Sequence, residues 1–210
     1  MQETKNMTKK LLITLFIIAL FASCGTRGDN NAQQPICPTT HDYGVLINGV
    51  RWATRNVDMP GTFAETPESF GMLFQWNRKK GWNAVDEEVE GWNRRLARGR
   101  RWTRVNDPCP KGWRVPTFEE ILSLENADSE WTTKNGVYGR IFGSTLFLPA
   151  AGWRNSIGSL TRVGGVGFYW SSTQGRNTIN AWYLSFNRNS VYVPGKLRDN
   201  GLSVRCVSIN

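Results

Sequence analysis

Alternating hydrophobic and polar positions predict β-structure over most of the second half of the chain. In the segment 181–186, Trp182, Leu184 and Phe186 fall on one face of a strand, because side chains alternate along an extended backbone. Other apolar runs are bounded by turn residues and read as further short strands, at 137–142, 145–150, 167–172, 191–193 and 202–207.

Earlier segments carry local signals of a hairpin, a turn and a strand. Asn48-Gly49 lies between the apolar residues of 45–52, which predicts a tight β-hairpin. The sequence Thr66-Pro67-Glu68-Ser69 is typical of a helix start and predicts a short helix. We expect residues 71–76 to form a strand or a buried loop.

One helix is predicted clearly, at about 117–126. Thr117 and Glu120 have the spacing of a capping box, in which the hydroxyl and the carboxylate each accept a backbone N–H from the other residue. Apolar residues then recur at helical spacing to about Asn126. Few helices beside several short strands indicate an α+β fold.

The segment 77–107 is unusual in composition. Trp82, Trp92 and Trp102 are spaced ten residues apart, an acidic run covers 86–90, and arginines crowd 94–104. The segment reads as a long loop with two open interpretations. In the first, the three rings are exposed and stack on a sugar, while Arg94 and Arg95 bind its acidic groups. In the second, the rings are buried and anchor the loop to the body of the domain.

The N-terminal residues resemble an export signal. A charge-free run from Leu11 to Ala22 follows Lys9 and Lys10, and it is shorter than the about 20 residues of a membrane span. Phe21-Ala22-Ser23-Cys24 resembles the lipobox of bacterial lipoproteins. An ordinary cleaved signal peptide is the alternative.

From the lipobox we expect three parts: a signal peptide at 1–23, a lipidated Cys24 with a flexible tether at 24–39, and one domain at 40–210. Acyl chains such as palmitate on Cys24 would hold the protein in the outer membrane. The domain would then face the cell surface or the periplasm.

Composition narrows the chemistry. The chain has 210 residues, 26 Lys and Arg against 17 Asp and Glu, a formal net charge of +9, and one His. A single imidazole excludes a multi-histidine metal site, and His41 lies at the edge of the tether, where a solvated ring is expected. Carboxylates for glycoside hydrolysis fall in the charged loop or in the helix cap. We expect no enzyme activity, no cofactor and no metal.

The arginine cluster would suit binding to nucleic acid, but the export signal argues against that partner.

Several motifs, in order along residues 43–208, resemble the Fibrobacter succinogenes major paralogous domain. They are Asn48–Val57 (NGVRWATRNV), Asp107–Thr117 (DPCPKGWRVPT), Phe147–Gly152 (FLPAAG), Tyr169–Ser172 (YWSS) and Ser203–Cys206 (SVRC). The family occurs on lipoproteins and cell-surface proteins of Bacteroidetes-like bacteria, and the resemblance implies a single C-type-lectin-like domain. The Gly112–Glu120 segment is also similar to the helix start of formylglycine-generating-type domains.

The active sites of those two fold relatives are not matched here. The calcium-binding signatures of lectins are missing, and residues 129–198 contain only Glu130 as an acidic residue. No late pair of cysteines offers a copper site. We therefore expect a non-catalytic binding domain for adhesion or glycan binding. The alternative is a structural or assembly subunit that binds envelope or fimbrial proteins.

Some of the matched motif residues have expected structural roles. Trp113 and Trp170 should fill the core, and Arg114 and Arg205 should hold carbonyls or carboxylates between layers. Three cysteines follow Cys24, so at most one intramolecular pair can form. Cys109 with Cys206 is favoured over either pairing with Cys37, since it would close a loop of about a hundred residues.

Overall fold

The computed structural model describes residues 41–209. The chain divides after Cys37 into two units, and the described residues all belong to the second, Pro38–Asn210. The predicted signal peptide at 1–23, the lipidation site Cys24 and the tether to residue 39 lie outside the described residues.

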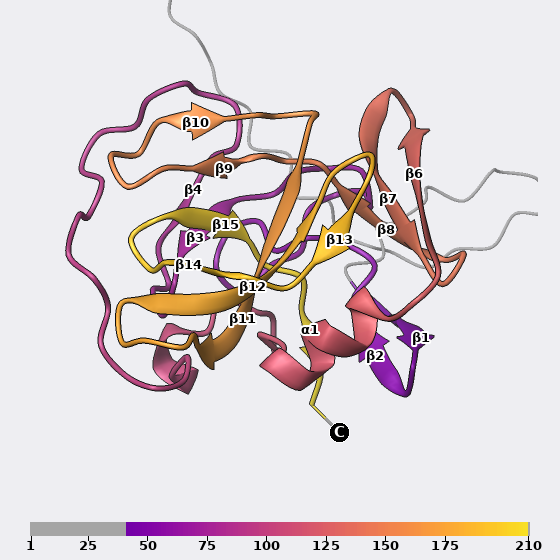
Figure 1. Cartoon of the computed structure of the whole chain (residues 1–210), viewed down its shortest axis with the longest axis horizontal. Coiled ribbons are helices and arrows are strands. Elements are labelled where there is room, and N and C mark those ends of the chain that lie inside the picture. The colour runs from indigo at the N-terminus through magenta and orange to yellow at the C-terminus, as the bar shows by residue number, and fades with distance from the viewer. Residues whose placement is uncertain (1–40, 210) are drawn as a thin grey trace, which may run out of the picture. The chain divides into compact units, whose positions relative to one another are not determined.

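The largest sheet has nine strands (Figure 1). Its path runs through β10 (Leu160–Thr161), β9 (Trp153–Arg154), β15 (Gly201–Ser203), β11 (Gly167–Gln174), β12 (Asn180–Phe186) and β13 (Val191–Tyr192). Three further strands extend it: β14 (Gly195–Leu197) on β12, β3 (Leu73–Gln75) on β15, and β4 (Gly81–Trp82) on β3. Every pairing is antiparallel except that of β11 with β15.

Two smaller sheets complete the strands. The first has the order β1 (Val45–Ile47), β2 (Val50–Trp52), β16 (Val207–Ser208) and β5 (Trp113–Arg114). The second is a meander of β6 (Ser129–Lys134), β7 (Val137–Phe142) and β8 (Leu146–Pro149). The first sheet therefore joins the two ends of the described chain.

The predicted helix is present as α1 (Phe118–Glu125). The Thr117 hydroxyl accepts the N–H of Glu120 at 3.3 Å, and the Glu120 carboxylate accepts the N–H of Thr117 at 2.7 Å. Both halves of the capping box form, because the signal depends only on residues next to one another in the chain.

The predicted fold class, α+β and C-type-lectin-like, is wrong. The structure is mostly β, with 37% strand and 7% helix. Helix α1 has only eight residues and buries only Ile121 and Leu124. It therefore covers one patch of the strands, while loops and other strands supply the rest of the core instead of a helical layer.

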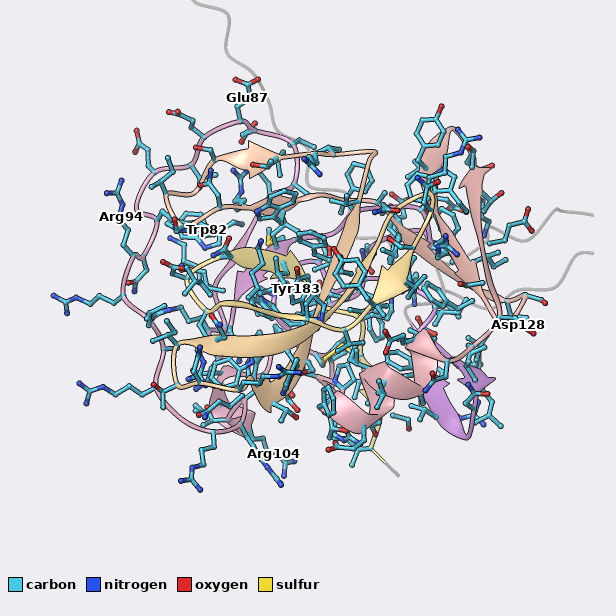
Figure 2. The ribbon with its side chains drawn as sticks, in the orientation of Figure 1. Trp82, Glu87, Arg94, Arg104, Asp128 and Tyr183 are labelled. Atoms are coloured by element: carbon cyan, nitrogen blue, oxygen red, sulfur yellow. A yellow bond between two sulfur atoms is a disulfide. The ribbon has the colours of Figure 1, made fainter. Side chains whose placement is uncertain are left out.

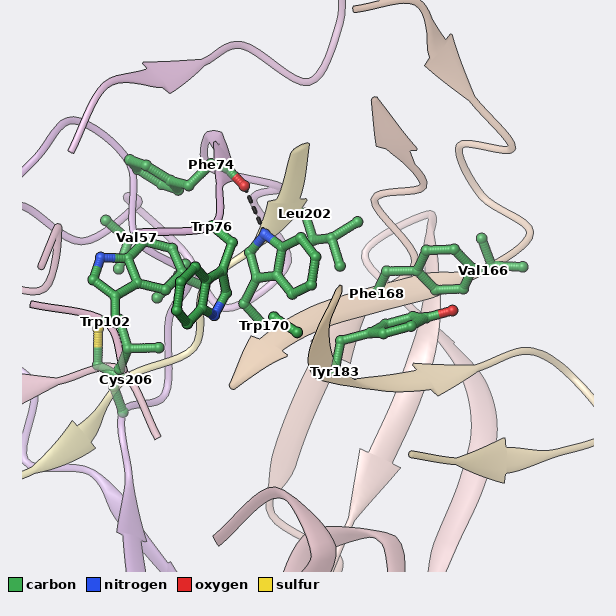
Figure 3. Close-up of a cluster of buried hydrophobic side chains, with 14 residues drawn as sticks. Val57, Phe74, Trp76, Trp102, Val166, Phe168, Trp170, Tyr183, Leu202 and Cys206 are labelled. Atoms are coloured by element: carbon green, nitrogen blue, oxygen red, sulfur yellow. Dashed lines mark hydrogen bonds between the residues drawn. The ribbon is translucent and has the colours of Figure 1, made fainter. Parts of the chain in front are cut away.

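Two hydrophobic clusters lie on opposite faces of the β11–β12 hairpin. Ala181 and Tyr183 point into the first, and Leu184 and Phe186 point into the second. The first cluster holds Trp76, Trp102 and Trp170, and the Trp170 indole N–H donates to the Phe74 carbonyl at 2.7 Å (Figure 3). Both faces of the hairpin are thus covered, which makes it the centre of the fold.

The local predictions have mixed outcomes. Asn48 and Gly49 form the expected hairpin turn with positive φ of 47° and 81°. The short helix predicted at 66–69 is wrong, because the segment makes a single turn closed by a hydrogen bond from Ser69 to Thr66. The run 202–207, predicted as one strand, splits into β15 and the start of β16, which belong to different sheets.

Candidate functional site

The long loop between β4 and η1 (Arg104–Asn106) runs along the edge of the molecule, at the left of Figure 1. Its backbone bonds to neighbouring segments: Leu160 N–H donates to Glu87 O at 2.8 Å and Gln174 N–H donates to Arg100 O at 3.0 Å. Trp102 N–H donates to Ser172 O at 2.8 Å. The loop is therefore held in one path although it contains no regular element.

The acidic part of the loop is anchored by the buried side chain of Arg154. Its guanidinium donates to the carbonyls of Asn83 at 2.9 Å and Asp86 at 2.7 Å, and to that of Glu87 at 3.3 Å. Burial lowers the pKa of Arg154, and the carbonyl acceptors compensate for the lost hydration. Asp86 and Glu87 are consequently exposed, and Figure 2 shows Glu87 extending outward.

The basic part of the loop is anchored in the same way by Arg198. This side chain donates to the carbonyls of Ala97 at 3.0 Å and Gly99 at 2.9 Å, and its guanidinium lies 4.0 Å from the centre of the Trp76 ring. Neither anchoring role was predicted from the sequence. Each binds carbonyls far away in sequence, so no local signal identifies it.

Two of the three loop tryptophans are buried. Trp82 is 8% exposed and Trp102 is 7% exposed, so the expectation of exposed stacking rings is wrong for both. Trp92 is half-buried, and its ring lies 5.2 Å from that of Trp82. Trp92 also packs on Gly158, where a Cβ would come within 2.9 Å of the indole. The rings anchor the loop, which is the second of the two interpretations of the sequence.

The arginines of the loop point the other way. Six are exposed and line its outer side, and Figure 2 shows Arg94 and Arg104 extending outward. We call this set the arginine ridge: Arg94, Arg95, Arg98, Arg100, Arg101 and Arg104. Within residues 41–209 none of them forms an ion pair. The predicted ligand-binding residues Arg94 and Arg95 are therefore accessible, at the end of the ridge nearest the acidic run.

A cleft of about 690 Å³, which we call the basic cleft, opens at the other end of the ridge. Four cationic side chains without an ion pair in the described part of the chain line it: Lys79, Arg101, Arg104 and Lys111. A fifth cation, Arg114, is neutralised by Glu120 through two hydrogen bonds of 2.6 and 2.7 Å. Asp107 and Glu119 are the acidic residues of the wall, so positive charge is in excess.

The wall of the cleft is a tight turn after η1. The Asp107 carboxylate accepts the N–H groups of Cys109 at 2.9 Å and Val115 at 3.1 Å, which closes the turn between them. Burial raises the pKa of Asp107, whereas these two hydrogen bonds lower it. Cys109 forms a disulfide with Cys206, the pair favoured by the sequence, and so ties the turn to the segment between β15 and β16.

Part of the cleft lining is apolar. Trp113 was expected in the core, but it is only half-buried and lines the cleft, where its ring meets Phe63 edge-on at 5.6 Å. Trp102 and Ile209 also contribute to the lining. A lining that combines cations with aromatic rings suits a ligand with acidic groups on a less polar body, because guanidinium binds carboxylate or sulfate in a bidentate fashion.

Two predicted structural residues behave as expected. The Trp170 ring is fully buried, and Arg205 donates to Asn56, Ala53 and Phe147 across the layers. Burial lowers the pKa of Arg205 to about 10.

The chain has a single imidazole, that of His41. His41 is exposed and its ring meets Tyr43 at 4.6 Å. Within residues 41–209 no group of three or more His, Cys, Asp or Glu side chains could hold a metal ion. In the same range no helix has the length and apolar character needed to cross a membrane.

Comparison with protein families finds a match to part of the chain. A family model described as a domain of unknown function (DUF8237) matches residues 125–207, from the last residue of α1 to the first of β16. Neither the curated proteins nor the solved structures include a match to this chain. The matched segment contains Cys206 but not the arginine ridge or the residues 79–114 that form most of the basic cleft.

Proposed function

We propose that this chain is a non-catalytic binding protein of the cell envelope that binds acidic glycans in the basic cleft. The observation that carries the proposal is the lining of the cleft, where Lys79, Arg101, Arg104 and Lys111 have no anionic partner among the described residues. Unpaired cations that surround aromatic rings attract a ligand that supplies both the negative charge and a surface for the rings.

The ligand class follows from the combination of cationic and aromatic side chains in the cleft. Sugar rings have apolar faces that fit Trp113, and uronate or sulfate groups match the guanidinium groups of Arg101 and Arg104. The rim arginines of the ridge would add long-range attraction that salt screens. Binding in the cleft should resist moderate salt better than binding along the rest of the ridge, because a ligand in the cleft also contacts aromatic rings.

The cellular location of the domain is part of the same proposal. Removal of residues 1–23 and lipidation of Cys24 would place the domain on the outer membrane, facing the cell surface or the periplasm, as the lipobox and the resemblance to the Fibrobacter succinogenes major paralogous domain indicate. Replacement of Cys24 by Ser should move the protein from the membrane fraction to the soluble fraction and abolish labelling by palmitate. Retention of the variant in the membrane with its label would contradict the anchoring.

The binding proposal is tested with the full chain, purified in mild detergent, on an array of acidic and neutral glycans at low and moderate salt. We expect selective acidic hits that survive moderate salt, and at least a tenfold weaker affinity in the double variant R101A/R104A, since each charge-assisted contact contributes about 1.5–3 kcal/mol.

The matched control is R176A/R188A, which removes two exposed arginines that do not line the cleft. The control should bind like the unmodified protein. An equal loss of affinity in both variants would mean that net charge alone causes the effect, which would contradict a specific site. The absence of any acidic glycan among the hits would also contradict it.

A second candidate function is assembly with an envelope or fimbrial protein. Strand β1 lies at the edge of its sheet; Leu46 within it is 63% exposed, and Tyr43 just before it is 76% exposed. An open strand edge with apolar side chains can accept a strand from another protein. Recovery of one defined envelope protein with the unmodified chain, but not with Leu46→Lys, would favour this function over glycan binding.

A further inference from the structure

A second pocket of about 320 Å³ opens beside the basic cleft, and the sequence analysis did not predict it. We call it the amide pocket, because four carboxamide side chains line it together with two exposed lysines: Gln75, Asn77, Asn93, Asn106, Lys79 and Lys80. No carboxylate is among its lining residues. Its charge is therefore positive.

The carboxamides form a wall whose positions are fixed by hydrogen bonds. Gln75 donates to the carbonyls of Asn93 at 2.6 Å and Asp199 at 2.8 Å. Asn77 donates to the Arg98 carbonyl at 3.0 Å and accepts the Thr103 N–H at 2.8 Å. The pocket is thus shaped before any ligand arrives, which lowers the entropic cost of binding.

The lysines supply charge that the protein leaves uncompensated. Within the described chain neither Lys79 nor Lys80 forms an ion pair. The Lys80 ammonium lies 3.9 Å from the centre of the Trp82 ring, a cation–π contact that keeps it at the pocket. An anionic group in the pocket would meet both ammonium groups.

The two pockets are adjacent, because they share one lining residue and others are neighbours in the chain. Lys79 lines both of them. The first residue of η1, Arg104, lines the basic cleft, and the last, Asn106, lines the amide pocket. One short turn and one lysine side chain therefore lie between the two sites, and a single extended ligand can contact both.

We propose that the basic cleft and the amide pocket are two subsites for one linear polyanionic glycan, each holding one of its acidic groups. This inference rests on the proposed function and narrows its ligand class to chains with two or more acidic groups. The second contact of such a chain is intramolecular, so the chain should bind far more tightly than its single acidic unit.

The experiment compares single acidic sugars with chains of the same sugar. The full chain in mild detergent is titrated with galacturonic acid and with tetragalacturonate, and with a sulfated monosaccharide and a heparin tetrasaccharide, while tryptophan fluorescence is recorded. For at least one of the two pairs, the tetrasaccharide should bind at least tenfold more tightly per acidic group than the monosaccharide.

Variants separate the two subsites. K80M should lower the ratio of tetrasaccharide to monosaccharide affinity at least fivefold, because Lys80 lines only the amide pocket, and R101A/R104A should weaken both ligands. R176A/R188A serves as the control for net charge.

The outcomes distinguish the two proposals. If the single sugars bind and the chains bind no more tightly per acidic group, or if K80M leaves the ratio unchanged, the two-subsite inference is wrong while the proposed function stands. If no acidic sugar of either length binds, the proposed function itself fails.

Discussion

Glu120 shows how much one side chain can connect. Its carboxylate caps α1 through the N–H of Thr117 and also accepts both hydrogen bonds from Arg114 in β5. It thereby joins the helix to the first sheet and neutralises a cation that lines the basic cleft. Burial raises the pKa of Glu120, but the hydrogen bonds and charge of Arg114 and the bond from Thr117 lower it more, so the net shift is downward.

That shift predicts a pH-dependent contribution to stability. Since the pKa of Glu120 is lower in the folded than in the unfolded state, its contribution is complete above the ordinary value of 4.5 and is lost as pH falls through the folded value. Glu120→Gln should lower the free energy of unfolding by about 1 kcal/mol near pH 7, allowing for solvent screening, and by less at pH 3.

Urea denaturation of the unmodified protein and the Glu120→Gln variant at a series of pH values measures this difference. Glu119→Gln, at the exposed neighbouring position, is the control. A difference that stays constant from pH 7 to pH 3 would contradict the assigned role of the carboxylate.

Single residues also show which features a sequence can reveal. The capping box and the Asn48-Gly49 turn were predicted because all their partners are adjacent in the chain. The roles of the buried Arg154 and Arg198 were not predicted, because the loop carbonyls that they bind lie about 70 to 100 residues away in a segment without regular structure. The residues next to a buried arginine in the sequence do not distinguish it from an arginine on the surface.

At the scale of elements, the long loop depends on Asn77. This residue has a positive φ of 53°, and its side chain bonds to Arg98 and Thr103 on the far part of the loop. Asparagine tolerates this left-handed conformation better than most residues. One side chain thus holds the backbone that carries Arg101 and Arg104 into the basic cleft.

Two substitutions at Asn77 separate its backbone role from its side-chain role. Asn77→Gly removes the hydrogen bonds but keeps the positive φ accessible, and it should cost about 2 kcal/mol of the free energy of unfolding. Asn77→Ala adds the left-handed strain and should cost about 1 kcal/mol more. Chemical denaturation measures both. Equal stability of the two variants would show that the backbone conformation is not strained for alanine.

The loop tryptophans show why the elements of the site were only partly predictable. Their ten-residue spacing drew attention to Trp82, Trp92 and Trp102, but spacing cannot tell which side of a loop faces the protein. Burial of Trp82 and Trp102 turns the intervening arginines outward, so the charges and not the rings are accessible. The sequence therefore left the orientation of the rings open, whereas Arg94 and Arg95 are accessible as expected.

At the scale of the whole molecule, the sequence led to an overestimate of the helix content and so to the wrong fold class. One strong helix signal and one weak one, at 66–69, suggested a mixed fold, but only α1 forms. Strand β6 was not predicted, since Ser129–Lys134 is polar and mostly outside the core. The split of 202–207 into β15 and β16 depends on which sheets meet there, and that is a property of the assembled molecule.

The disulfide is a covalent link between two distant parts of the described chain. Cys109 and Cys206 are 97 residues apart, and their bond ties the turn of the basic cleft to the segment where β15 passes into β16. In the chain-entropy model a loop of this length contributes about 4–5 kcal/mol by restricting the unfolded state. The bond also keeps the cleft wall next to the core, because Cys206 is fully buried in the first hydrophobic cluster.

We therefore expect C109A/C206A to fold but to lose about 4 kcal/mol of the free energy of unfolding, because the variant removes the restriction on the unfolded chain. Urea denaturation of the oxidised protein, the reduced protein and the variant measures the loss, and the reduced protein should match the variant. Acidic-glycan affinity should fall in parallel, since the 107–115 turn loses its covalent tie to the core. A variant as stable as the oxidised protein would contradict this role, and unchanged stability after reduction would show that the bond does not form in solution.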